Sequence, residues 1–209
     1  MPKRIERNPR GYRERRVEIR ETLNRFLIVC EGEKTEPNYF RHFRVPREVV
    51  ELRIEGTGYN TESLVREALR LRQELGYTDE DDQVWCVFDR DSTRKQQFNA
   101  AVKMAEDNGM HAAYSNQAFE LWYLLHFDYH DAALHRKHYM TKLTERLGRP
   151  YRKNDDEIYD RLLDAQEVAV QRARRLHTAQ SKLQPADANP STTVYKLVEE
   201  LRRFMPPYQ

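Results

Sequence analysis

Carboxylate side chains follow apolar runs of the chain at the points where the runs end. Glu31 comes directly after FLIVC, and Asp89 and Asp91 come just after VWCVF. Glu120 stands near the start of another apolar stretch, FELWYLLHF. Carboxylates that gather repel one another unless a cation compensates them, and their oxygens suit Mg²⁺ or Mn²⁺. The sequence therefore predicts a divalent-metal site with these four ligands, and a buried, paired structural glutamate stays the alternative for Glu120.

The same carboxylates favour cleavage of phosphodiester bonds. A divalent ion held by few carboxylates usually also holds substrate phosphates. Such an ion activates a water molecule and stabilises negative charge on the departing oxygen. We therefore take Glu31, Asp89 and Asp91 as candidate catalytic residues.

Polar residues beside Glu31 extend the candidate site. Gly32 would let the backbone pass close to a phosphate. Lys34 is a candidate phosphate contact, with a plain exposed lysine as the alternative. Glu33 and Glu36 are interpreted as solvated charges at the start of a helix, where acidic groups favour the helix dipole.

The elements that must position these residues alternate between strand and helix. Short apolar or alternating runs at 26–30, 49–54, 84–88 and 110–115 predict four strands, and helical spacing of apolar residues follows each of them. This order predicts an α/β fold with an open, mainly parallel four-stranded sheet flanked by helices. Because ligands bind beyond the carboxyl ends of parallel strands, the carboxylates are expected to meet at one edge.

The chain after about residue 130 shows helical patterns alone. One apolar stripe covers 158–169 and another covers 194–204. Between them, 184–192 is predicted to be a loop, with a helix starting at Ser191 or Thr192.

These patterns predict three regions. Residues 1–24 form a basic arm, residues 25–130 an α/β domain, and residues 131–209 an α-helical C-terminal subdomain packed on it. Residues 1–25 hold nine Lys and Arg against four Asp and Glu, in a chain whose net charge is +2. A basic arm could steer the protein toward phosphate backbones, or it could be a solvated terminus without a specific role.

Composition indicates a soluble protein of the cytoplasm. No apolar run approaches the roughly 20 residues that span a bilayer, and no signal-peptide pattern precedes the first strand. The two cysteines, Cys30 and Cys86, lie inside apolar runs, which favours reduced thiols in the core.

Four ordered blocks of the chain resemble the RloB family, whose members are found beside bacterial restriction and other defence genes. The blocks are LIVCEGEKTEPNYF, VFDRDS, SNQAFELWYLLHF and NPSTTVYKLVEEL, and the resemblance covers roughly residues 25–205. The family usually has SNPxFE where this chain has SNQAFE, so Gln117 departs from the pattern.

The RloB family is in turn similar to the TOPRIM superfamily of topoisomerases, primases and OLD-type nucleases. That resemblance implies a TOPRIM-like fold in which Glu31 acts as general acid/base or metal ligand while Asp89 and Asp91 hold Mg²⁺. It also implies a role in antiphage defence through cleavage of DNA or RNA. Asn116 and Lys153 match family blocks and are taken as candidate phosphate-binding residues.

Two other functions stay open at this point. VFDRDST also fits the opening motif of haloacid-dehalogenase-type phosphatases, with Asp89 as nucleophile, although that family expects the motif on its first strand. A non-catalytic effector or assembly subunit of a defence system, which binds partner proteins, is the other alternative. The expected partners are therefore nucleic acid, other defence proteins or a second copy of this chain.

Overall fold

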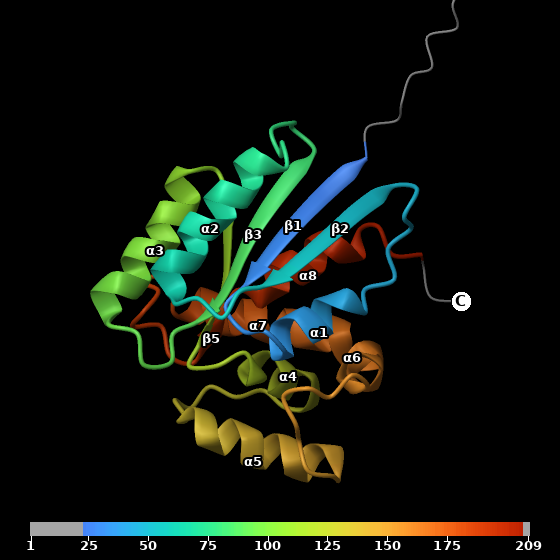
Figure 1. Ribbon diagram of the computed structural model, residues 1–209. Coiled ribbons are helices and arrows are strands. Elements are labelled where there is room, and N and C mark those ends of the chain that lie inside the picture. The colour runs from blue at the N-terminus through green and yellow to red at the C-terminus, as the bar shows by residue number, and fades with distance from the viewer. Residues whose placement is uncertain (1–22, 207–209) are drawn as a thin grey trace, which may run out of the picture.

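Five strands form one mixed sheet in the computed structural model, which describes residues 23–206. The basic arm predicted at residues 1–24 falls outside the described residues except for its last two positions. The strands lie in the order β2-β1-β3-β4-β5 (Figure 1). Their bounds are β1 Asn24–Cys30, β2 Val50–Gly56, β3 Asp82–Asp89, β4 His111–Asn116 and β5 Ser191–Thr192. The four predicted strands are confirmed and parallel, but the prediction of a four-stranded sheet is wrong, because β5 adds an antiparallel edge beside β4.

Helices cover both faces of this sheet. The helices are α1 Thr35–Arg41, α2 Thr61–Glu74, α3 Lys95–Asp107, α4 Glu120–Phe127, α5 Arg136–Leu147, α6 Ile158–Leu162, α7 Gln166–Ala179 and α8 Val194–Arg202, with a 3₁₀ turn, η1, at Leu163–Ala165. Helices α2 and α3 lie together on one face, and α1, α4, α7 and α8 pack on the other (Figure 1). Turn η1 interrupts the apolar stripe predicted at 158–169, so two helices stand there where one was expected.

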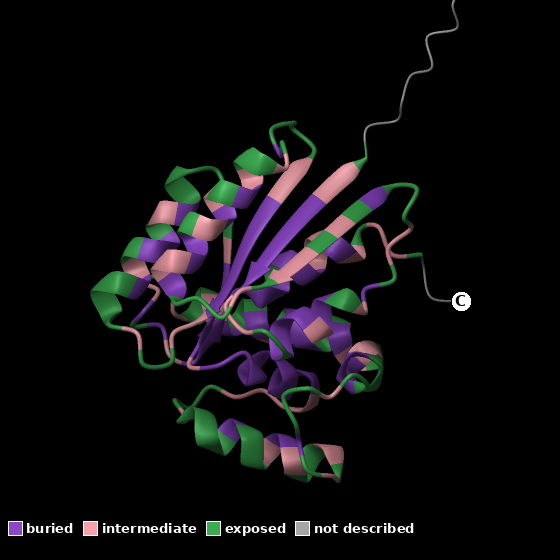
Figure 2. Ribbon diagram, in the orientation of Figure 1, coloured by how far each residue is buried: buried purple, intermediate pink, exposed green. Residues whose placement is uncertain are grey.

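The central strands are buried on both faces, as continuous apolar runs in a parallel sheet require. Every residue of Phe26–Cys30 is 0% exposed, and the strands stand out as the buried centre in Figure 2. Alternate residues face opposite cores, so Cys30 packs on the α1 side while Cys86 packs on the α2 side. Both cysteines are free and buried, as predicted.

Local residue types bound two of the helices that cover the sheet. Asn60 caps α2, because its Oδ1 accepts a hydrogen bond from the Ser63 backbone N–H at 3.2 Å. Gly109 follows α3 in the left-handed region at φ +66°, a conformation that glycine adopts without a steric penalty.

Hydroxyl groups near the C-terminus join the last segment to the sheet. The prediction of a helix start at Ser191 or Thr192 is wrong, because these two residues form β5 and α8 begins at Val194. The Thr193 hydroxyl accepts the Tyr114 backbone N–H at 2.9 Å, and it donates to the Ala112 carbonyl at 3.1 Å.

The region after residue 130 therefore contributes a strand to the sheet and helices to its core. Helices α7 and α8 belong to the same apolar cluster as α1 and α4. The division of the chain at residue 130 stays a prediction.

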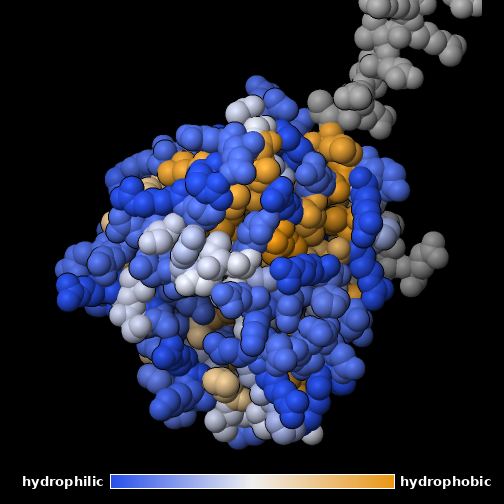
Figure 3. All heavy atoms as spheres, in the orientation of Figure 1, coloured by the Kyte–Doolittle hydropathy of each residue, from blue (hydrophilic) through white to orange (hydrophobic). Residues whose placement is uncertain are grey.

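The opposite edge of the sheet is β2, which pairs with no further strand among residues 23–206. Charged side chains at Glu51, Arg53 and Glu55 alternate along it, which is a common way to discourage pairing with another strand. An apolar groove of about 410 Å³ follows this edge, with Leu52 and Ile54 in its wall. Figure 3 shows apolar surface gathered around β1 and β2 on a molecule that is otherwise mostly hydrophilic on this side. Within residues 23–206, the helices are all too short or too polar to cross a membrane.

Candidate functional site

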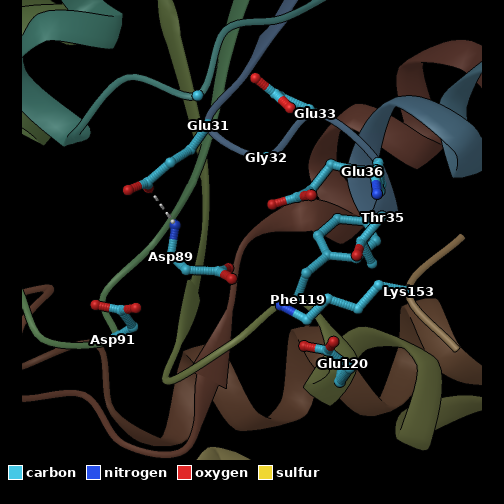
Figure 4. Close-up of a pocket in the computed structure, with 12 residues that line it drawn as sticks. Glu31, Gly32, Glu33, Thr35, Glu36, Asp89, Asp91, Phe119, Glu120 and Lys153 are labelled. Carbon is cyan, nitrogen blue, oxygen red and sulfur yellow. Dashed lines mark hydrogen bonds between the residues drawn. The ribbon is translucent and has the colours of Figure 1, made fainter. Parts of the chain in front are cut away.

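Acidic side chains from three strand ends line one cavity. The cavity has a volume of about 320 Å³ and lies beyond the carboxyl ends of β1, β3 and β4. In the described part of the chain its carboxylates are Glu31, Glu33, Glu36, Asp89, Asp91 and Glu120. Figure 4 shows them around a common space, with Asp89 and Glu36 directed toward each other. The topology thus brings together the four carboxylates that the sequence predicts as metal ligands, as parallel strands should.

Hydrogen bonds fix Glu31 at the end of β1, where its carbonyl accepts the Gly58 backbone N–H at 3.0 Å. Its backbone N–H donates to the Val87 carbonyl at 2.8 Å, and its Oε2 accepts the Asp89 backbone N–H at 3.1 Å (Figure 4). Burial raises the pKa of its carboxyl from 4.5 to about 7, and the charges of Asp91 and Glu36 add to the rise while the hydrogen bond opposes it. Glu31 can therefore gain or lose a proton near neutral pH.

Asp89 and Asp91 lie in different surroundings. Burial raises the pKa of Asp89 well above its usual range, and the nearby charges of Glu36 and Glu120 raise it further. Asp91 is exposed at the rim, where Oδ1 accepts a hydrogen bond from the Ser92 hydroxyl at 2.7 Å and Oδ2 forms an ion pair with Arg136. The DxD pair therefore supplies one half-buried carboxylate directed into the cavity and one already engaged at the surface.

Glu36 is a site residue that the sequence interpretation misplaced. It was expected to be solvated, but it is 5% exposed and lines the cavity, because the first turn of α1 faces inward. Burial and the charge of Glu120 raise its pKa to about 7. Its spacing gave a signal, since Glu36 precedes Tyr39 and Phe40 by three and four residues and so shares their buried helical face. Glu33, by contrast, is exposed as predicted.

Gly32 explains how Glu36 fits into the wall. A Cβ atom on Gly32 would stand 2.3 Å from Glu36 Oε2, so a larger residue would displace the carboxylate. The glycine thus matters for close packing of a side chain.

Glu120 is held at the start of α4 by a tyrosine that sequence reasoning did not find. It is 3% exposed, and its Oε1 accepts a hydrogen bond from the Tyr151 hydroxyl at 3.1 Å. Tyr151 comes from the loop after α5, and no local pattern indicates that this loop folds back onto α4. The pairing satisfies one oxygen of Glu120 and leaves its carboxylate in the cavity wall.

The candidate phosphate-binding residues separate into two groups. Lys34 and Lys153 are exposed and line the acidic cavity together with Gly32. Asn116 lies elsewhere: it is 0% exposed, and its amide donates to the carbonyls of Pro185 at 3.0 Å and Ala188 at 2.8 Å. Its position thus links β4 to the 184–190 loop, outside the cavity lining.

The donor set has the chemistry of a hard-cation site. Within residues 23–206, no group of three or more His, Cys, Asp or Glu side chains is arranged to hold a metal ion. The donors are nevertheless carboxylate oxygens, which Mg²⁺ and Mn²⁺ prefer. Three of them, in Glu31, Glu36 and Asp89, have pKa values raised chiefly by burial and further by neighbouring carboxylates, and a cation would oppose both effects. The residues therefore fit a divalent cation by type, and its binding stays a prediction.

The chain matches a protein-family model over most of its length. The family described as RloB-like protein matches residues 26–201, which includes every carboxylate of the cavity. No curated protein and no solved structure matches the chain.

Proposed function

Because this chain belongs to the RloB family and lines one cavity with carboxylates, we propose that it is a Mg²⁺- or Mn²⁺-dependent nuclease. Its substrate is the phosphodiester backbone of DNA or RNA, and its setting is bacterial antiphage defence. The proposal includes a TOPRIM-like role for Glu31, Asp89 and Asp91, to which Glu36 and Glu120 are added.

One observation supports this proposal above the others. Carboxylates that are far apart in the sequence line a single cavity at the carboxyl ends of parallel strands. Burial removes several of these carboxylates from water, which makes their charged forms less favourable. A divalent cation would offset this loss of free energy. A fold that needed only stability would not gain from such an arrangement.

The carboxylates divide the chemical work by their surroundings. The charges of Glu36 and Glu120 raise the pKa of Asp89, and the charge of Glu120 also raises the pKa of Glu36. These three carboxylates therefore lie close together, and they would supply oxygen ligands. A bound divalent ion would polarise the phosphodiester and lower the pKa of attacking water. Glu31, whose pKa is about 7 in the metal-free protein, would accept the proton of that water.

The lysines at the rim would bind the substrate. Lys34 and Lys153 are exposed on the cavity lining, where their ammonium groups can reach phosphate oxygens. Lys153 lies in a loop tied down by Arg149, whose Nη2 donates to both carboxylate oxygens of Asp155 at 2.9 and 2.7 Å. This bifurcated ion pair closes the loop that carries Lys153.

The test is a cleavage assay with labelled DNA and RNA panels in Mg²⁺, Mn²⁺ or EDTA. Cleavage should require the metal and should fall at least about 100-fold in Asp89→Asn and Glu31→Gln. Asp107→Asn is the matched control, since it removes an exposed carboxylate paired with Lys103 at the far end of α3. Equal cleavage by Asp89→Asn, or cleavage that persists in EDTA, would contradict the proposed site.

The apolar groove along β2 favours a second candidate, a subunit that assembles with other defence proteins. In that case Glu31→Ala would protect cells from phage as well as the wild type does, and pull-down from the native host would recover the partner. A phosphatase of the haloacid dehalogenase type would instead turn over p-nitrophenyl phosphate with Asp89 as its nucleophile.

A further inference from the structure

A second cavity lies beside the acidic one. It has a volume of about 460 Å³ and lies between the starts of α2 and α3. The two cavities share their loops: Gly58 and Asp91 line the acidic cavity, while Asn60 and Ser92 line the second. A ligand that extends out of the acidic cavity along this side therefore meets the second cavity next.

The lining of the second cavity is suited to an anion. Two guanidinium groups, those of Arg66 and Arg94, line it together with four hydroxyl groups, those of Thr61, Ser63, Ser92 and Thr93. A guanidinium presents its donors in a planar fork that matches two oxygens of a phosphate, and hydroxyls donate to a third. The wall is partly fixed, because the Thr93 hydroxyl lies 3.3 Å from that of Thr61, which is 2% exposed.

The charges of the second cavity reverse those of the first. Glu62 is the carboxylate that lines it in the described part of the chain, and its Oε1 is occupied by Arg66 Nη2 at 2.8 Å. The Arg66 side chain is 66% exposed, so its remaining N–H groups stay open to a ligand. Arg94 adds a positive charge that no carboxylate of this cavity balances.

A nucleic-acid strand needs such a place. The acidic cavity has six carboxylates against two lysines on its described lining, so it repels a polyanion except where a cation intervenes. Affinity for a strand must then come mainly from contacts to phosphates on either side of the reacting one. The second cavity offers such contacts beside the first.

We propose that the cavity between α2 and α3 binds a backbone phosphate of the nucleic-acid strand, next to the phosphodiester that enters the acidic cavity. This assignment rests on the proposed nuclease function, and it names the group that holds the strand. Contacts to phosphates do not distinguish one base sequence from another, so the site can bind both DNA and RNA.

The test measures binding separately from cleavage. Fluorescence anisotropy with labelled single-stranded DNA and RNA is performed in EDTA on an Asp89→Asn background, which leaves the strand intact. Arg66→Ala/Arg94→Ala should lower affinity roughly five- to tenfold for every sequence. It should also reduce the slope of log affinity against log salt by about 0.7 for each phosphate that the protein no longer binds. Inorganic phosphate should compete with the strand in the parent protein and should not compete in the double variant.

The matched control removes the same charge elsewhere. Arg53→Ala/Arg70→Ala changes two exposed arginines, each already paired with glutamates of its own element, and should leave affinity and slope unchanged. Circular dichroism confirms that both double variants are folded. Equal losses of affinity in the two double variants, no loss in either, or no binding by the parent protein would each overturn the phosphate site.

The two proposals fail in different ways. Cleavage by the wild-type protein together with unchanged binding by Arg66→Ala/Arg94→Ala would reject the phosphate site and leave the nuclease. Arginine-dependent binding without cleavage in any metal would reject the nuclease and leave the phosphate site.

Discussion

Replacing Glu31 by glutamine should make the metal-free protein more stable at neutral and alkaline pH. The substitution keeps the shape of the side chain and an oxygen that can accept the Asp89 N–H. It removes a carboxyl whose pKa is raised from 4.5 to about 7, chiefly by burial. In the folded wild type this group keeps its proton to higher pH than in the unfolded chain. Stability is therefore lost as the pH rises from about 4.5 to about 7.

The magnitude follows from the same pKa values. The difference is 7 − 4.5 = 2.5, and each pKa unit corresponds to about 1.4 kcal/mol, so the full effect is about 3 kcal/mol. Between pH 5 and pH 8 the free energy of unfolding of Glu31→Gln should rise relative to the wild type by roughly 2–3 kcal/mol. The neighbouring acids titrate in both proteins, so most of their contribution cancels in the difference between the two curves, which keeps Glu31 itself and its charge effect on Asp89.

The assay is urea unfolding at pH 5, 6, 7 and 8 in EDTA, followed by fluorescence of the buried Trp85 and Trp122. Glu80→Gln, which removes an exposed carboxylate outside the cavity, is the control. Mn²⁺ at 100 times its dissociation constant for the wild type should then stabilise the wild type by about 2.7 kcal/mol. The same Mn²⁺ concentration should stabilise Glu31→Gln by less. A wild-type-to-variant difference that stays constant from pH 5 to pH 8 would refute the reasoning.

Three further outcomes follow from contacts in and near the cavity. Gly32→Ala should displace the Glu36 carboxylate and weaken Mn²⁺ binding about tenfold in titration calorimetry. The free energy of unfolding of this variant should change by less than about 1 kcal/mol. Unchanged Mn²⁺ affinity would argue against Glu36 as a ligand. Tyr151→Phe removes the hydrogen bond to buried Glu120 and should lower the free energy of unfolding by about 1–2 kcal/mol. Urea unfolding would measure this loss, and a free energy equal to that of the wild type would contradict it. Thr193→Val leaves the buried Tyr114 N–H without its acceptor and should cost about 1–3 kcal/mol, and a thermal midpoint equal to that of the wild type would show that the hydroxyl does not matter.

The parallel part of the sheet could be predicted because its signals are local and strong. The runs FLIVC and VWCVF are apolar at every position, as strands covered on both faces must be, and the helices between strands carry clear 3.6-residue spacing. Strand β5 could not be predicted in this way. It has two residues, too few for a pattern, and it exists through pairing with β4 and the Thr193 hydroxyl.

The candidate site was predictable to the extent that strand ends determine it. Glu31 and Asp89 follow neighbouring parallel strands, so their proximity comes from topology alone. Glu36 was misplaced because an acid in a first helical turn usually faces water, and here tertiary packing overrode that preference. Tyr151 reaches Glu120 across 31 residues through a loop, a contact that no local rule anticipates.

The hydroxyl link between Thr193 and β4 also sets the order in which a newly made chain can finish folding. Its two partners, Tyr114 and Thr193, are 79 residues apart, so β4 emerges from the ribosome long before the segment that covers its edge. Helix α4, which begins with Glu120, packs on α7 and β5 and must wait for the same segment. The elements that frame the acidic cavity are thus completed only once translation has passed residue 193, and a shorter nascent chain carries the cavity's carboxylates without the segment that packs on α4 and β4.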